Sequence, residues 1–143
     1  MRLIALAMAL LAAPTVISPA IAEPAAEAVK NAWPGSFVAQ GETWLFKIKG
    51  GQPADLRKGG EDEKPGSDEI RVSLDGGNML VLNGSSIAYN YQAFIAEKPS
   101  DKGNRTSVCT LMPSALMHEI WPGNLPGIRL TKFSEASDSM GCF

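Results

Sequence analysis

Apolar residues recur at every second position along much of the chain, which is the periodicity of a half-buried β-strand. The clearest case begins at residue 44, where Trp44, Phe46 and Ile48 alternate with Leu45 and two lysines. Similar segments follow, separated by runs rich in Gly, Pro, Asn and Asp. We therefore expect about six strands, at residues 44–49, 69–74, 78–82, 86–96, 106–112 and 128–133.

Two glycine-containing turns connect the middle strands. Asp75-Gly76-Gly77 follows residues 69–74, and Asn83-Gly84 follows residues 78–82. Asn-Gly is the strongest short-range hairpin signal in the chain, because both residues tolerate the positive φ of a tight hairpin turn. The pattern predicts that residues 69–96 form a three-stranded β-meander.

Residues 50–69 have a different composition from the strands around them. They contain one large apolar residue, Leu56, and their centre is a run of glycines and charges of both signs. Such a segment has little apolar surface to offset the entropy lost on ordering. We expect a mobile, solvated loop here, and we expect its central residues 59–66 to be dispensable for folding.

Two short segments have helical character. Residues 24–32 start with a proline followed by alanines and Glu27, and residues 114–121 follow a candidate cap, Ser114. With about six strands against one or two short helices, the expected fold class is mostly β. It would be a small antiparallel β-sandwich or a part-closed barrel. The alternative is an α+β fold with the helix at 114–121 packed on an antiparallel sheet.

The first 22 residues have the pattern of a cleavable signal peptide. Arg2 precedes an apolar run, Pro14 interrupts it, and Ala20-Ile21-Ala22 matches the small-x-small rule of a cleavage site. The alternative is an uncleaved membrane anchor, because residues 3–22 are uncharged and about 20 residues can span a bilayer. We expect an exported protein, periplasmic or extracellular, with one small β-rich domain at residues 23–143 and no membrane insertion after cleavage.

Charge excludes some partners. Without Arg2 the chain has 12 basic and 15 acidic residues, a net charge of −3. This balance gives no electrostatic attraction to nucleic acid or to an anionic membrane surface.

The two cysteines, Cys109 and Cys142, both follow the cleavage site. Two cysteines in a small exported domain most often form a disulfide. The alternative is a redox-active or metal-binding pair. Redox pairs usually sit two residues apart, and a metal site needs more ligands than two cysteines and one distant histidine. We therefore expect a structural disulfide, with no metal and no cofactor.

Catalysis has one candidate, the single histidine His118. In a helix, Ser114 and His118 would share a face at i, i+4 and could form a dyad. No Gly-x-Ser-x-Gly turn accompanies them, and six of the fifteen acidic residues lie in the predicted mobile loop. The sequence therefore favours a partly buried, structural histidine and a protein that is not an enzyme.

Aromatic residues are the remaining candidates for recognition. Trp33, Trp121, Tyr89 and Tyr91 could form an exposed patch, because Trp and Tyr are common anchors at interfaces. The alternative is that they fill the core. We expect a non-enzymatic binding or inhibitor module with a protein partner in the cell envelope. The alternatives are an accessory structural subunit of an envelope assembly and a small hydrolase that uses His118.

Overall fold

Strand pairing organises the whole of the described chain. The structure is a computed structural model, and it describes residues 33–137 and 139–143. Its strands are β1 (Ser36–Ala39), β2 (Thr43–Lys49), β3 (Gln52–Lys58), β4 (Glu69–Asp75), β5 (Asn78–Asn83), β6 (Tyr89–Ile95), β7 (Asn104–Thr106), β8 (Leu116–Ile120) and β9 (Gly127–Glu135).

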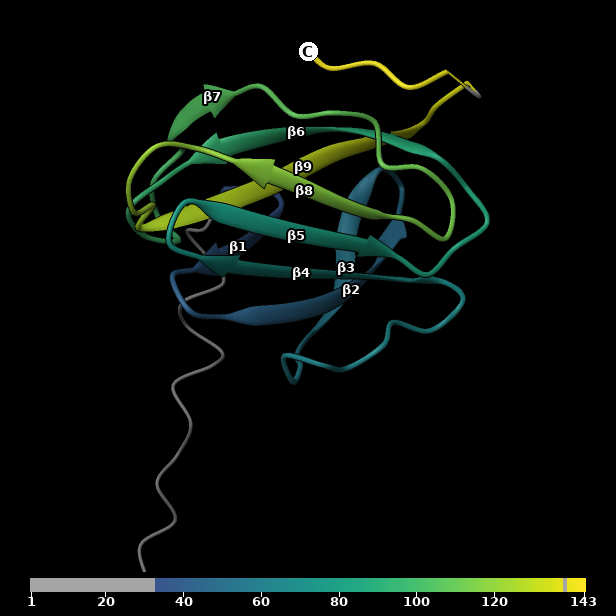
Figure 1. Ribbon diagram of the computed structural model, residues 1–143, viewed down its shortest axis with the longest axis horizontal. Coiled ribbons are helices and arrows are strands. Elements are labelled where there is room, and N and C mark those ends of the chain that lie inside the picture. Colours follow the sequence, from purple (N-terminus) through teal and green to yellow (C-terminus); the bar gives the residue numbers. More distant parts are fainter. Residues whose placement is uncertain (1–32, 138) are drawn as a thin grey trace, which may run out of the picture.

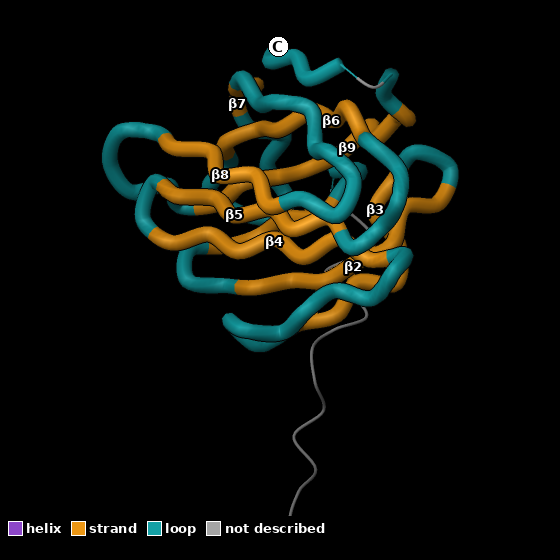
Figure 2. The backbone as a smooth tube through the Cα atoms, turned by 45° about the vertical axis from the view of Figure 1, so that its right-hand side comes forward, coloured by secondary structure: helices purple, strands orange, loops and turns teal. Residues whose placement is uncertain are grey.

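These strands form two antiparallel sheets, which pack face to face as a sandwich (Figures 1 and 2). One sheet has four strands in the order β1-β9-β6-β7, and the other has five in the order β3-β2-β4-β5-β8. The expected mostly β sandwich is therefore confirmed. Among the described residues there is no helix, and hence none that could span a membrane.

Inward-facing side chains from both sheets form one core. Phe133 of β9 lies at its centre, with its ring stacked on Tyr91 at 5.3 Å and edge-on to Phe46 at 5.8 Å. Burial of this apolar surface is the main force holding the sheets together. The fully buried aliphatic residues around these rings include Val38, Ile70, Val72, Leu74, Val81, Leu111, Ile128 and Leu130.

The helix expected at residues 114–121 is wrong, because this segment is strand β8. Leu116, His118 and Ile120 are exposed, while Met117 and Glu119 are partly buried, so burial alternates with period two. Two helical turns are marginal on their own. As a strand, the segment pairs with β5 along five residues and packs Met117 against the core. The other expected helix, at residues 24–32, lies outside the described residues.

The hairpin expected at Asn83-Gly84 is also wrong, because β5 and β6 belong to different sheets. Asn83 is fully buried, and its side-chain amide donates to the backbone oxygens of Ile87 and Met112 and accepts from Ser85. These bonds hold the chain as it crosses between sheets. Only the first half of the expected meander, the β4–β5 hairpin around Gly76 and Gly77, is present.

The segment 50–69 is partly regular rather than a single loop. Its first part is β3, which pairs with β2. The remainder folds over the outer side of β2, where a Cβ on Gly59 would collide with Cδ1 of the fully buried Leu45. Arg57 of β3 holds this part through ion pairs to Glu63 and Glu69.

The strand expected at residues 106–112 is mostly irregular. Strand β7 ends at Thr106, and isolated bridges follow from Cys109 to Cys142 and from Leu111 to Tyr89. This stretch lies along the open side of the sandwich between β7 and β8. Trp121 Nε1 donates to Thr106 Oγ1 at 2.7 Å, which ties the end of β8 to β7.

Candidate functional site

The disulfide between Cys109 and Cys142 is present. It fastens the end of the chain to the irregular stretch after β7, where Val108 and Phe143 exchange two backbone hydrogen bonds of 3.1 Å. Such a bond is compatible with an oxidising, exported compartment.

The four aromatic residues proposed for recognition do not form one patch. Tyr91 is 2% exposed and lies in the core, and Tyr89 is partly buried against the same Phe133 ring. Trp121 is partly buried and hydrogen-bonded to Thr106. Only Trp33 is exposed, with Lys102 over its ring. The tyrosines serve packing, and the two tryptophans are held at different places on the surface.

His118 and Ser114 do not form a dyad. In the strand β8, about 3.3 Å of rise per residue separates positions that a helix would bring together. Ser114 instead lies in the turn before β8 with a φ of 49°. The imidazole of His118 is exposed, and its Nε2 lies 3.1 Å from Asn78 Oδ1 on β5.

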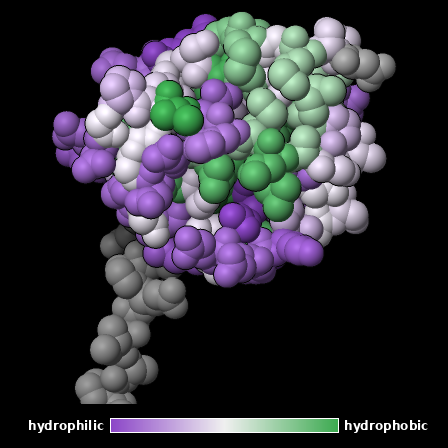
Figure 3. Space-filling model, viewed as in Figure 1, coloured by the Kyte–Doolittle hydropathy of each residue, from purple (hydrophilic) through white to green (hydrophobic). Residues whose placement is uncertain are grey.

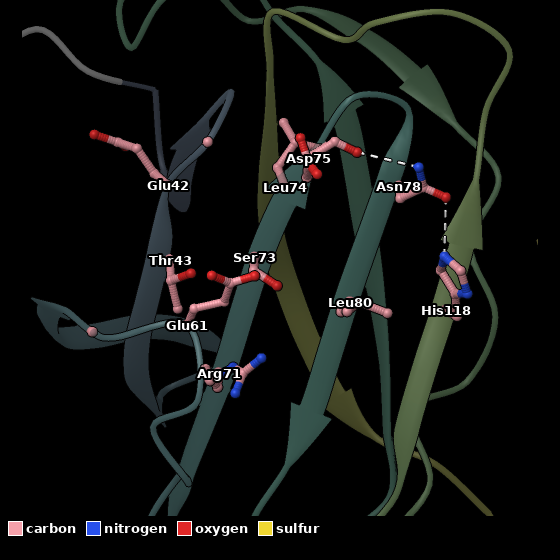
Figure 4. A pocket seen from close by; sticks show the side chains of 12 residues that line it. Glu42, Thr43, Glu61, Arg71, Ser73, Leu74, Asp75, Asn78, Leu80 and His118 are labelled. Atoms are coloured by element: carbon pink, nitrogen blue, oxygen red, sulfur yellow. Dashed lines mark hydrogen bonds between the residues drawn. The ribbon is translucent and has the colours of Figure 1, made fainter.

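A hollow of about 600 Å³ opens on the outer face of the five-stranded sheet. Its volume falls within the range of small-molecule and cofactor sites. Outward-facing side chains of β2, β4, β5 and β8 form its floor, and the loop after β3 forms one wall (Figure 4). Its lining combines hydroxyl, amide, imidazole, guanidinium and carboxylate groups, from Thr43, Ser73, Asn78, His118, Arg71, Glu42, Glu61 and Asp75.

Arg71 is the distinctive group of this hollow. Its guanidinium lies over β4, between the loop that carries Glu61 and strand β5 (Figure 4). Nη1 donates to the backbone oxygen of Glu63 at 3.1 Å, while Nε is buried without a hydrogen-bond partner. Within the described chain no carboxylate lies within ion-pair distance of it. The guanidinium of Arg71 therefore has no ion-pair partner within the described part of the chain.

The neighbouring cations are neutralised, in contrast. Lys58 pairs with Glu42 at 2.8 Å, and Arg57 pairs with Glu63 and Glu69. Hydrogen bonds from Arg57 hold the pKa of both Glu63 and Glu69 below their usual value. Burial opposes ionisation of Glu42, but its bonds to Lys58 and Trp44 still lower its pKa. These carboxylates are committed to partners within the fold.

Exposed apolar side chains lie beside the hollow. Leu116 is 56% exposed and Ile120 is 68% exposed on β8, and the partly buried Leu80 and Leu82 lie next to them on β5. Figure 3, in the orientation of Figure 1, shows hydrophobic surface gathered over these two strands. We call this surface the β5–β8 face and define it by Leu80, Leu82, Leu116, His118 and Ile120.

Sequence reasoning predicted a partly buried, structural His118, which is wrong because His118 is exposed and lines the hollow. It also missed Arg71 and the hollow. A signal was present, because Arg71 and Ser73 alternate with the buried Val72 and Leu74 and must face outward. The sequence could not show which strands would lie beside them. The sequence pattern also predicted a helix at residues 114–121. It therefore did not predict that Leu116, His118 and Ile120 lie on the same outer face of the five-stranded sheet as Arg71.

In comparisons with known proteins, no family model, no curated protein and no solved structure matches this chain.

Proposed function

We propose that this protein is an exported, non-enzymatic binding module that holds a protein partner on the outer face of its five-stranded sheet. The observation that carries the proposal is Arg71, whose guanidinium lines an open hollow and has no carboxylate within ion-pair distance in the described part of the chain. A carboxylate is the natural complement of a guanidinium, because its two oxygens match the planar arrangement of donors.

The surroundings of Arg71 favour a protein over a small anion as the partner. Leu116 and Ile120 are large apolar side chains held in the open beside the hollow. Protein interfaces typically combine an apolar centre with a few placed charges. We infer that an acidic side chain of the partner binds Arg71 while neighbouring apolar side chains cover the β5–β8 face.

A peptide selection tests this proposal even though the partner is unidentified. Random peptides displayed on phage are selected on the immobilised protein, and the enriched peptides are synthesised for calorimetry. We expect them to contain an acidic residue next to apolar ones. Arg71→Gln should weaken their binding by about 1.5–3 kcal/mol, the usual contribution of a hydrogen bond to a charged group, or at least tenfold in affinity.

The matched control is Lys98→Gln, which removes an exposed positive charge from the loop after β6, in the other sheet. It should leave the affinity of the peptides unchanged. Peptides that bind the wild type and Arg71→Gln equally well would contradict the role of the hollow. Replacing the peptide's acidic residue by its amide should reproduce the loss caused by Arg71→Gln.

Export is a separate part of the proposal. It rests on the pattern of residues 1–22, which lie outside the described residues, and on the disulfide. Mass spectrometry of the protein from the exported fraction should find Glu23 as the first residue. An intact Met1 on that protein would show that the leader is not cleaved.

A further inference from the structure

Strand β8 is an edge of the five-stranded sheet, and one side of its backbone is unpaired. Ala115 O accepts from Asn83 N, and Trp121 N donates to Gly77 O, so the odd-numbered residues of β8 face β5. By the alternation of an antiparallel ladder, the N–H and C=O groups of Leu116, His118 and Ile120 point away from β5. In the part of the chain that the structure describes, no backbone group bonds to them.

The other sheet edges carry protection that β8 lacks. Strand β3 contains Pro53, has charged residues at Asp55, Arg57 and Lys58, and its pairing with β2 is interrupted by a bulge. Strand β7 has only three residues. In β1, the free N–H of Ala39 donates to the Glu42 carboxylate. Proline, charges, bulges and short length are the usual means of preventing edge-to-edge pairing. Strand β8 has no proline, lysine, arginine or bulge, and its one acidic residue, Glu119, faces inward, where its carboxylate accepts a hydrogen bond from Cys109 N.

The three residues with free backbone groups are also self-complementary. If two copies of β8 meet in antiparallel fashion about a two-fold axis at His118, the two histidines form the central pair. Leu116 of each copy then lies opposite Ile120 of the other, so apolar residues pair with apolar residues on the same face. A register shifted by one hydrogen-bonded step, with Leu116 opposite His118, would instead place Ile120 opposite Ser114. The His118-centred register is therefore the favoured one.

We propose that the protein forms a symmetric dimer through β8, in which the two five-stranded sheets become one continuous ten-stranded sheet. The occupant of the β8 edge is a second copy of this chain. A two-fold pair uses the β8 edge of both copies, so no β8 edge remains to bind a third copy and the assembly stops at the dimer.

The dimer has a consequence for the hollow. His118 lines the hollow and also lies at the two-fold axis, so each copy places its imidazole beside that of the other. The two hollows then open on the same side of the joined sheet, with Arg71 in each. A partner with two acidic segments could bind both hollows at once, which raises its apparent affinity. The dimer itself does not depend on the proposed function.

Sedimentation velocity of the purified protein tests the dimer directly. A five-residue edge buries less than the ~1,200 Å² of a standard interface, so we expect a concentration-dependent equilibrium between monomer and dimer. Ile120→Lys places a charge on the edge and should give a monomer at all concentrations. Because Ile120 is 68% exposed, the melting temperature of the Ile120→Lys variant should stay close to that of the wild type. Leu116→Lys provides a second variant with the same expectation.

The matched control is Leu56→Lys on β3, the opposite edge of the same sheet, where the leucine is 43% exposed. It should leave dimerisation unchanged. Under mild oxidation, His118→Cys should form a disulfide-linked dimer, because paired residues across strands lie about 5.5 Å apart between Cα atoms. Leu56→Cys should not.

Three results would overturn the proposal. The first is a wild-type monomer up to about 1 mM protein, a concentration at which even weak association is visible. The second is an Ile120→Lys variant that still dimerises, which would place the interface elsewhere. The third is a β8 edge that pairs only with a strand of another protein. None of them affects the peptide selection on Arg71, so the dimer and the proposed function fail independently.

Discussion

The carboxylate of Glu119 accepts a hydrogen bond of 2.7 Å from the backbone N–H of Cys109. Glu119 is an inward-facing residue of β8, and Cys109 belongs to the stretch that closes the sandwich beside it. The bond therefore joins the edge of the five-stranded sheet to the segment that carries the disulfide. It also explains why an acidic residue occupies an inward position of this strand.

We predict that Glu119→Ala lowers the free energy of unfolding by about 1–3 kcal/mol, because the partly buried N–H of Cys109 then lacks a partner. Glu119→Gln keeps an acceptor oxygen and should lose less. Urea unfolding at neutral pH measures both. Glu97→Ala, in an exposed loop, is the control and should change stability by less than about 0.5 kcal/mol. Equal effects of the two alanine variants would show that the bond does not contribute.

Loss of the disulfide should release the end of the chain. The bond joins residues 33 apart in the sequence, and Thr110 N donates to Gly141 O at 2.8 Å beside it. We expect Cys142→Ser to cost roughly 2–4 kcal/mol, mainly because the unfolded chain gains freedom. A reductant should lower the stability of the wild type to that of the variant and leave the variant unchanged. Two free thiols in freshly isolated wild-type protein would contradict this prediction.

Tyr91 should make the protein sensitive to alkali. Its ring is buried and its hydroxyl has no hydrogen-bond partner among the described residues. Burial raises the pKa of this phenol above its usual value of 10.0, and the charge of Glu119 acts in the same direction. The folded state therefore holds the proton more tightly than the unfolded state, so this contribution to stability is complete below pH 10 and is lost as the pH rises further.

The measurement is the free energy of unfolding from pH 7 to pH 11 for the wild type and Tyr91→Phe. At neutral pH, Tyr91→Phe should be as stable as the wild type or slightly more stable, because it removes a buried hydroxyl without a partner. Above pH 10 the free energy of unfolding of Tyr91→Phe should exceed that of the wild type by an increasing amount. Tyr89→Phe retains Tyr91 and serves as the control, with the wild-type alkaline loss. Parallel pH profiles for the wild type and Tyr91→Phe would refute the assignment.

Arg57 should hold the loop after β3 in place. It pairs with Glu63 and Glu69, and its hydrogen bonds lower the pKa of both carboxyl groups below the usual 4.5. A lowered pKa means that the contribution is present above pH 4.5 and is lost as the pH falls below it. Since exposed ion pairs contribute little to global stability, the effect should be mainly local.

A glutamate-specific protease reports on this loop through cleavage after the exposed Glu61. Arg57→Gln should be cut there faster than the wild type at pH 7, and Arg105→Gln, an exposed arginine on β7, should be cut at the wild-type rate. Any difference in the free energy of unfolding between Arg57→Gln and the wild type should become smaller below pH 4.5. Equal cleavage of all three proteins would support the sequence-based expectation of a mobile loop.

Local sequence patterns were enough to predict the fold class and the disulfide. Alternation at Trp44, Phe46 and Ile48, and again at Ile70, Val72 and Leu74, is a local property that specifies strands with one buried face. Two cysteines permit only one intramolecular bond. These features depend on the identity and spacing of nearby residues, and so they can be read without knowing what the strands pack against.

Contacts between distant parts of the chain determine the structure of residues 116–120, the path of the chain at Asn83 and the position of the hollow. Residues 116–120 have a composition that suits a short helix, but pairing with β5 and the inward packing of Met117 make them a strand. Asn83-Gly84 suits a hairpin, but the buried amide of Asn83 uses its hydrogen bonds to carry the chain between sheets. The hollow brings Arg71, Asn78 and His118 together only because β4, β5 and β8 are neighbours. Apart from proline, local propensities differ by at most about 1 kcal/mol per residue. Burial of a single large side chain contributes about 1.5–3 kcal/mol, so long-range packing prevails where the two disagree.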